Sequence, residues 1–160
     1  MYVVPHDKSR VKNIKTYFES LFNNGSTDAS SDHKTIELAT AVLMIEISLA
    51  DDHIQEEERN TIKVILLKHF RLSEKEINEI IELAVNEVDH AVSLYEFTQF
   101  LNDTLCMSDK VTIIEHLWHI AYADSVLDKY EEYYIRKIAD LLYISHSDYI
   151  QTKLKTTEQS

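Results

Sequence analysis

The sequence predicts an all-α protein, a compact bundle of about eight helices built from two pseudo-symmetric three-helix repeats. The 160 residues include one Gly and one Pro, so little interrupts regular helices. The stronger observation is an internal repeat, in which residues 46–67 align with residues 119–140 at a constant offset of 73, without a gap. Its identical pairs are Ile47/Ile120, Ala50/Ala123, Asp51/Asp124, Glu58/Glu131, Ile62/Ile135 and Ile65/Ile138. The apolar pairs have helical spacing, which a duplicated helical hairpin keeps for packing.

The length of the chain allows one domain with a well-buried core and is too short for two independent domains. We expect residues 1–35 to form an N-terminal helix and a flexible loop, and residues 36–155 to form the repeated helical domain. The two copies are expected at residues 36–90 and 109–155. The polar residues 156–160 are expected to form a disordered tail.

Three helices are expected in the first half of the chain. An apolar stripe predicts a helix over about 7–22, and the small polar residues after it predict a loop over 23–32. Apolar residues at helical spacing then predict helices over about 34–50 and 55–70. Residues 51–54 form the turn between those two helices.

Capping patterns predict where the next two helices begin. Ser73 with Glu76 forms a capping box, in which each side chain accepts a hydrogen bond from the other residue's free backbone N–H. Ser93 with Glu96 has the same spacing and predicts the start of a short fifth helix. This short helix would connect the two copies of the repeat.

The second copy is expected to repeat the order of helices in the first. Ser108 is predicted to cap a sixth helix that ends at Asp124, and a short turn leads into a seventh helix over 128–143. Ser145 with Asp148 is expected to open a terminal helix. Helices two to four then correspond to helices six to eight.

Charge and composition exclude several classes of function. With 28 Asp and Glu against 16 Lys and Arg, the net charge of −12 repels nucleic acid and anionic membrane surfaces. Cys106 is the single cysteine, so neither an intramolecular disulfide nor a cysteine zinc site can form. No signal peptide, stable membrane anchor or membrane span is evident, so we expect a cytoplasmic protein.

Each copy carries an acidic pair in the pattern A-D-x-x-(I/L)-x-x-x-E. The pairs are Asp51 with Glu58 and Asp124 with Glu131. All four acids continue the apolar stripe of their helices rather than the solvated face, and a duplicated fold can bring both pairs close to its pseudo-twofold axis. A core-facing carboxylate needs a partner, because desolvating the charge alone is costly.

Two interpretations of these acids remain open. In the first, the acids only cap helices and turns: Glu131 completes a capping box, and Asp51 and Asp124 accept N–H bonds from the turns that follow them. This interpretation fits Glu58 less well, because a good N-cap residue is missing before its helix.

In the second interpretation, the four carboxylates bind a hard divalent cation, with Ca²⁺, Mg²⁺ or Mn²⁺ favoured over Zn²⁺. Glu46 and His119 occupy equivalent positions one turn before the aspartates and are candidate outer ligands. The pattern is not an EF-hand, because neither turn has the Gly and the alternating ligands of the 12-residue loop. His116 and His119 share a helix face and are interpreted together as surface or interface histidines.

The residues of both copies resemble a known family. The segment LWHIAYADSVLDKYEEYYIRKIADLLYISHSDYI, residues 117–150, resembles the C-terminal signature of TerB-like tellurite-resistance proteins, and MIEISLADDHIQEEER, residues 44–59, resembles the first repeat of that family. The resemblance covers about residues 36–152. It implies an all-helical bacterial cytoplasmic domain associated with tellurite resistance and stress operons, without known catalytic activity and with divalent metal bound by clustered acids.

The leading hypothesis is therefore a non-enzymatic, divalent-cation-binding interaction module of the TerB type. Its site would consist of Asp51, Glu58, Asp124 and Glu131, supported by Glu46 and His119. A protein partner is expected, such as another tellurite-resistance component, and the oligomeric state stays open. The alternatives are a metal-independent helical scaffold and a metal-dependent hydrolase with Glu46 or His119 as general base.

Overall fold

A computed structural model describes the chain at residues 14–24, 29–48, 56–87, 89–123 and 129–159. These ranges contain eight α-helices and no β-strand, which confirms the all-α prediction. The helices are α2 (Ile14–Asn24), α3 (Ala29–Ser48), α4 (Glu56–His69), α5 (Glu74–Val85), α6 (His90–Thr104), α7 (Met107–Ala123), α8 (Lys129–Leu141) and α9 (His146–Gln159). The pseudo-symmetry of the two three-helix units remains a prediction.

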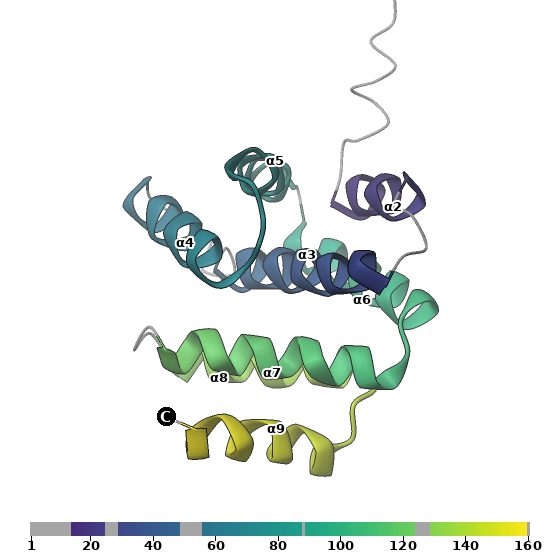
Figure 1. The fold of residues 1–160 in the computed structure, drawn as a ribbon, viewed down its shortest axis with the longest axis vertical. Helices are drawn as coiled ribbons and strands as arrows, with labels where there is room; N and C mark the ends of the chain where they lie inside the picture. Colours follow the sequence, from purple (N-terminus) through teal and green to yellow (C-terminus); the bar gives the residue numbers. More distant parts are fainter. Residues whose placement is uncertain (1–13, 25–28, 49–55, 88, 124–128, 160) are drawn as a thin grey trace, which may run out of the picture.

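The arrangement is layered around α3 (Figure 1). Helices α2 and α5 lie on one side of α3, α7 and α8 lie on the other side, and α9 covers the far side of α7. Helix α4 packs against α5, and α6 packs against both α2 and α8. Helix α3 thus contacts helices from both halves of the chain, which makes it the centre of the fold.

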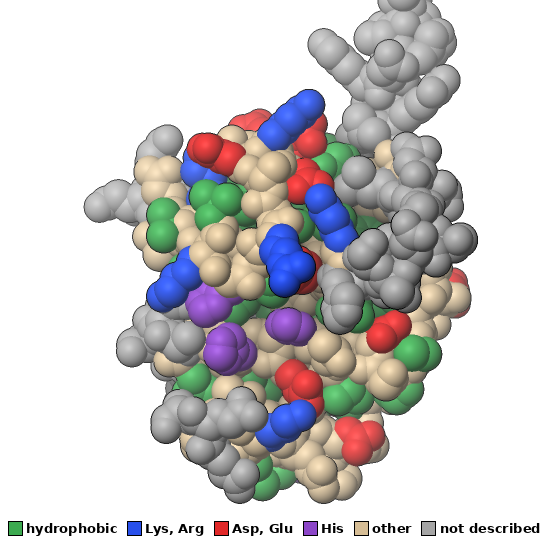
Figure 2. Space-filling model, viewed as in Figure 1, with side chains coloured by type: hydrophobic (Ala, Val, Ile, Leu, Met, Phe, Trp, Pro, Cys, Tyr) green, Lys and Arg blue, Asp and Glu red, His purple; other side chains and the backbone are tan. Residues whose placement is uncertain are grey.

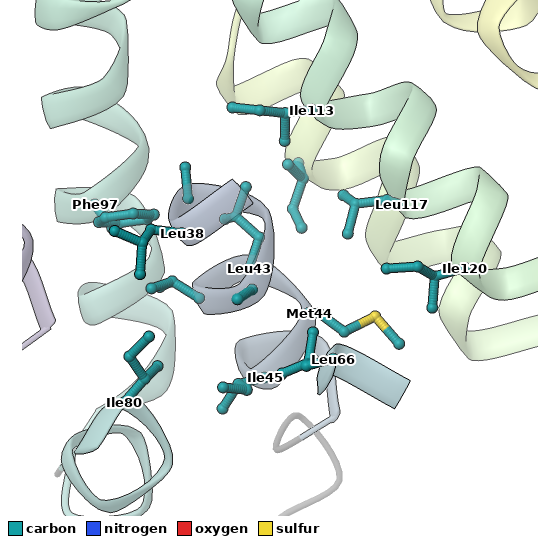
Figure 3. Close-up of a cluster of buried hydrophobic side chains, with 14 of the residues drawn as sticks. Leu38, Leu43, Met44, Ile45, Leu66, Ile80, Phe97, Ile113, Leu117 and Ile120 are labelled. Atoms are coloured by element: carbon teal, nitrogen blue, oxygen red, sulfur yellow. The ribbon is translucent and has the colours of Figure 1, made fainter. Parts of the chain in front are cut away.

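The sequence of α3 explains its central position. Every residue from Leu38 to Glu46 is buried, so this stretch is covered on all sides rather than on one stripe. Its one hydroxyl-bearing core residue, Thr40, is satisfied locally, because the hydroxyl donates to the Ile36 carbonyl at 2.8 Å. Figure 3 shows the aliphatic side chains of α3 facing Phe97 on one side and Ile113 and Leu117 on the other.

The N-terminal helix α2 is joined to the domain through its aromatic residues. The ring of Phe18 makes edge-to-face contacts with Phe97 and Phe100 of α6, at centroid distances of 5.2 and 5.6 Å. The Tyr17 hydroxyl donates to Glu79 Oε1 of α5 at 2.9 Å. The described part of the N-terminal segment therefore belongs to the same core as the rest of the chain.

Helix α3 begins earlier than the sequence predicted. It starts at Ala29 rather than near Lys34, so residues 29–32 of the expected 23–32 loop are helical, as is residue 33. Small polar residues are typical both of loops and of a helix's first turn, where unpaired backbone N–H groups need acceptors. The polar composition of this segment therefore did not distinguish a loop from a helix start.

One predicted capping box is confirmed and the other is wrong. Ser73 caps α5, since its hydroxyl accepts from Glu76 N at 3.0 Å while the Glu76 carboxylate accepts from Ser73 N at 2.9 Å. Helix α6 instead begins after Asp89, whose carboxylate accepts N–H bonds from the first turn. Ser93 consequently lies inside α6 rather than at its N-terminus.

The start of α7 also differs from the prediction. The helix begins at Met107, so Ser108 lies within its first turn rather than at the cap. The Cys106 carbonyl accepts from Lys110 N at 3.2 Å, and the Cys106 sulfur lies 3.3 Å from the Ser108 hydroxyl. The Ser108 hydroxyl therefore contacts the Cys106 sulfur at the start of α7, and Ser108 is not the predicted N-cap.

The terminal helix α9 begins as predicted and ends later. The Ser145 hydroxyl accepts from Asp148 N at 3.1 Å, which confirms the expected cap. The helix then continues through Gln159, so residues 156–159 of the expected disordered tail are helical. Thr156 is buried, and its hydroxyl donates to the Thr152 carbonyl at 3.0 Å, which shows why this polar segment is ordered.

Helix α8 ends in a Schellman motif built without glycine. Ile144 N donates to the Ala139 carbonyl and Tyr143 N donates to the Asp140 carbonyl, both at 3.0 Å. Tyr143 stands at the left-handed position with φ of 61° and an exposed side chain, while Ile144 is buried. Glycine is the usual residue at this position, because a Cβ atom is unfavourable at positive φ.

Replacing Tyr143 with glycine is therefore expected to raise the free energy of unfolding by about 1 kcal/mol. The change removes the steric penalty at positive φ, and it also removes the contact between the Tyr143 ring and Lys110 Nζ, 5.9 Å from the ring centroid. Urea unfolding measures the difference. Tyr143→Ala is the control, because it removes the same ring but keeps the Cβ; a gain as large in Tyr143→Ala would contradict the conformational explanation.

Candidate functional site

The structure describes the predicted metal residues to different extents. Asp51 and Asp124 lie outside the described residues. Glu58 and Glu131 are each the third residue of a helix, α4 and α8 respectively, and only their backbone is described. Glu46 and His119 are the two candidate ligands whose side chains are described, and their environments differ.

Glu46 lies in the interior near the end of α3. Its side chain is 4% exposed, and Glu46 Oε2 accepts a hydrogen bond from the Ser93 hydroxyl of α6 at 3.1 Å. The position is electrostatically demanding, because the C-terminal end of a helix carries partial negative charge and burial removes water from the carboxylate. Both effects favour a positive charge close to Glu46.

The hydrogen bond between Ser93 and Glu46 explains why the predicted N-cap role of Ser93 is wrong. A serine with a glutamate three residues later has the spacing of a capping box, yet the Ser93 hydroxyl here donates to a carboxylate 47 residues away. Ser93 is buried, so it could not act as an exposed cap. Ser93 therefore orients the Glu46 side chain and links α3 to α6.

His119 lies on the surface of α7 and faces the end of α4. Its ring makes an edge-to-face contact with His69, with centroids 5.5 Å apart, and His116 contacts Phe70 at 5.7 Å. Figure 2 shows histidine side chains gathered between the helices of the first half and α7. His116 and His119 thus contact aromatic rings at the end of α4, and His69 is a neighbour of His119 that the sequence did not predict.

Burial lowers the pKa of His116 below the ordinary value of 6.5, and His119 adds to this shift. The carboxylates of Glu37 and Glu115 act in the opposite direction without reversing it. The folded protein therefore favours neutral His116 more strongly than the unfolded chain does. The sign follows by linkage: the unfolded state binds the proton at higher pH, so the contribution of His116 to stability falls as the pH drops through and below 6.5.

Relative to the parent chain, a His116→Gln variant is therefore expected to become more stable as the pH falls from about 7.5 to about 5.5, because it lacks the unfavourable contribution of His116. Chemical unfolding at a series of pH values measures the slope. His146→Gln is the matched control, because His146 is exposed on α9. An unchanged slope in His116→Gln, or an equal change in the control, would show that other groups control the acid sensitivity.

The described C-terminal ends of α3 and α7 lie on the same side of the fold (Figure 1). The two helices also pack against each other. Figure 3 shows the Met44 side chain of α3 directed toward Leu117 and Ile120 of α7. Met44 and Ile120 thus lie near the described C-terminal ends of two helices that pack together.

Within the described ranges, no group of three His, Cys, Asp or Glu side chains is arranged to hold a metal ion. Since both signature aspartates fall outside those ranges, the four-carboxylate site remains a prediction. The donor set itself fits a hard divalent cation, because every predicted inner ligand is a carboxylate oxygen. If the site forms, Asp51, Glu58, Asp124 and Glu131 would hold the ion.

A polar network near the N-terminal end of α7 connects this helix to α6 and α8. Lys110 is buried, and its Nζ donates to Asn102 Oδ1 of α6 at 3.0 Å. Asn102 Nδ2 in turn donates to the Leu141 carbonyl at the end of α8, also at 3.0 Å. The network satisfies a carbonyl of the α8 terminus and joins three helices, so Lys110 has a structural role.

A surface groove of about 730 Å³ lies between α7 and α9. It is lined by Ser108, Val111, Thr112, Glu115, Asp148, Gln151, Thr152, Leu154 and Lys155. Lys155 and Glu115 form an ion pair across the groove at 3.3 Å. The lining therefore mixes paired charges, hydroxyls and aliphatic side chains, and it shares no residue with the predicted acidic site.

The fold and the repeated acidic turns define a class: an all-helical domain whose two halves carry the same signature. Residues 37–154 match the family model described as tellurite resistance protein TerB, so the chain belongs to the TerB family. Comparisons with curated proteins and with solved structures gave no match. Across the part of the chain that the structure describes, no helix combines the length and apolar character needed to cross a membrane.

Proposed function

We propose that this TerB-family protein is a non-enzymatic, divalent-cation-binding interaction module of the cytoplasm that takes part in tellurite resistance and related stress responses. The observation that carries the proposal is the exact recurrence of the acidic pair, Asp51 with Glu58 and Asp124 with Glu131, at one offset in a family member. Packing needs apolar residues at those spacings, whereas it gives no reason to repeat acids whose sequence position predicts that they face the core.

Two further features of the structure support the proposal. The helices that lead into the two turns pack together and end on the same side of the molecule. Glu46, one turn before the first aspartate, is a buried carboxylate at a helix C-terminus, where a nearby cation would be favourable. Tellurite is an anion and the chain has a net charge of −12, so we infer an indirect role rather than tellurite binding.

Calorimetric titration of chelator-treated protein with Ca²⁺, Mg²⁺, Mn²⁺ and Zn²⁺ tests the metal site. We expect saturable binding of at least one of the first three ions, and loss of at least tenfold in affinity, about 1.4 kcal/mol, in a Glu58→Gln/Glu131→Gln variant. A Glu82→Gln/Glu96→Gln variant is the control, because both residues are exposed on α5 and α6. Equal binding by both variants would refute the site.

One observation favours a second candidate, the metal-independent helical scaffold. The hydrogen bond from Ser93 to Glu46 gives this buried carboxylate a structural role in joining α3 to α6. If no divalent cation binds in the titration, the scaffold becomes the better description. The metal-dependent hydrolase requires turnover, so assays with phosphodiester, ester and peptide substrates under metal-loaded conditions separate it from both.

A further inference from the structure

Helix α4 exposes an apolar pair on its outer face. Val64 is 62% exposed and Leu67 is 40% exposed, although the neighbouring Ile65 and Leu66 are buried. The two side chains lie three residues apart and therefore share one face of the helix. Figure 2 shows hydrophobic side chains at the surface over α4, with Lys or Arg side chains and the group of histidines close by.

The second copy of the repeat has no such pair at the same place. The offset of 73 aligns Val64 with Lys137 and Leu67 with Asp140, and both of these residues are exposed on α8. This face of the helix is therefore at the surface in both copies and carries charged side chains in one of them. The apolar side chains of α4 are a feature of the first copy, not a requirement of packing.

The charges around this pair are basic in an acidic chain. Lys68 follows Val64 by four residues on α4, and Arg71 lies two residues beyond the end of the helix; both are exposed. The backbone N–H of Arg71 donates to Glu37 Oε1 of α3 at 3.2 Å. Lys63, on the adjacent face, pairs with Glu74 of α5 at 3.2 Å. The three basic residues Lys63, Lys68 and Arg71 outnumber the carboxylates of Glu37 and Glu74 at this end of α4, which favours a negatively charged partner although the whole chain has a net charge of −12.

Another exposed apolar pair provides a contrast. Val92 and Tyr95 of α6 are 50% and 54% exposed and are also three residues apart. Their exposed neighbours Asp89 and Glu96 are acidic. Apolar exposure on α6 therefore occurs in the opposite electrostatic setting, so the two faces should select different partners.

We propose that the α4 face, the surface formed by Val64, Leu67 and Lys68 of α4 and by Arg71 just after the helix, is the docking site for an acidic amphipathic helix of a protein partner. Such a helix would cover Val64 and Leu67 with apolar side chains one turn apart and place carboxylates against Lys68 and Arg71. A second copy of this chain is a poorer occupant, because two chains of charge −12 repel each other. The inference rests on the interaction part of the proposed function and requires no metal.

The test uses the full chain and a displayed library of helical 14-residue peptides. Apolar residues are fixed at one face, and the remaining positions vary among Glu, Lys and Gln. We expect selection to enrich glutamate-rich peptides whose binding weakens with added salt. A Val64→Lys/Leu67→Asp variant, which introduces the residues of the second copy, is expected to bind these peptides at least tenfold more weakly. Lys68→Glu/Arg71→Glu is expected to have a similar effect.

The matched control is Val92→Lys/Tyr95→Asp on α6, which should leave peptide binding unchanged. Three results would overturn the proposal: no enriched peptide, enrichment of lysine-rich peptides, or an equal loss in the α6 control. Two further results would also overturn it. If the chain self-associates with rising concentration and the α4 variant abolishes this, the face binds a second copy. If the chain binds anionic phosphatidylserine vesicles and the α4 variant abolishes this, the face binds lipid. Metal titration of the α4 variant distinguishes the two proposals, because the cation site should bind normally in a correctly folded α4 variant.

Discussion

Replacing Trp118 with alanine is expected to lower the free energy of unfolding by about 3–5 kcal/mol, the range for truncating a large buried aromatic residue. Trp118 is 0% exposed in the middle of α7. Its ring stacks on Tyr122 at 5.8 Å and contacts Tyr149 of α9 at 5.7 Å, while Lys153 Nζ lies 5.4 Å from the ring centroid. The substitution therefore leaves a cavity between α7 and α9 and removes three ring contacts.

Denaturant unfolding followed by circular dichroism measures the loss. Trp118→Phe is the control, since it keeps an aromatic ring of smaller volume. Among the described residues, Trp118 Nε1 has no hydrogen-bond partner. Replacing the indole with a phenyl ring therefore removes no hydrogen bond to these residues. We expect Trp118→Phe to lose less than half as much free energy of unfolding as Trp118→Ala. A cost below about 1 kcal/mol for Trp118→Ala would mean that α9 does not unfold together with the rest of the bundle.

The sequence predicted the core well because the repeat isolates the packing positions. Ile62 and Ile65 and their partners Ile135 and Ile138 are all buried. Residues that recur at one offset with helical spacing are those that a duplicated hairpin needs for contact, so coincidental apolar residues are filtered out. The exposed Val64 and Leu67 have charged partners in the second copy, so the same comparison separates core from surface.

Helix ends were predicted less well, because local patterns compete. Both Asp89 and Ser93 are good N-cap residues, and the sequence around them does not say which one acts. Tertiary structure decides, since the Ser93 hydroxyl is used by Glu46 of α3. The end of α8 is a similar case: Tyr143 adopts positive φ because the two Schellman hydrogen bonds and the burial of Ile144 outweigh the local steric cost.

The candidate site shows the limit of repeat alignment. The offset makes Glu46 and His119 equivalent, yet Glu46 is buried and His119 is exposed. The two positions receive different neighbours: α6 supplies Ser93 to Glu46, whereas the end of α4 supplies His69 to His119. Internal sequence similarity predicts the path of the helices but not the neighbours that each copy receives.

The second large effect concerns the acidic turns. In metal-free protein, an Asp51→Asn/Asp124→Asn variant is expected to melt at a higher temperature than the parent chain and to lose the response of the melting temperature to divalent cations. If four carboxylates share a small volume, their mutual repulsion destabilises the folded state wherever they are ionised. Two neutral amides of nearly the same shape remove half of that charge.

The pH dependence has a defined sign. Repulsion requires ionised carboxylates, so it grows as pH rises through their titration range and is relieved in mild acid. The metal-free parent should therefore be less stable near neutral pH than in mild acid, and this difference should shrink in the Asn variant. A cation at about 100 times its dissociation constant should stabilise the parent by about 2.7 kcal/mol, or roughly 5–10 °C for a chain of this size.

Thermal melts with chelator and with each divalent cation measure both effects. Asp103→Asn/Asp140→Asn is the matched control, because both residues are exposed on α6 and α8 and the charge change is the same. The control should keep the response to metal. If Asp51→Asn/Asp124→Asn instead lowers the metal-free melting temperature by several degrees, the aspartates stabilise the fold by accepting N–H bonds from their turns, and the shared cation site is refuted for this protein.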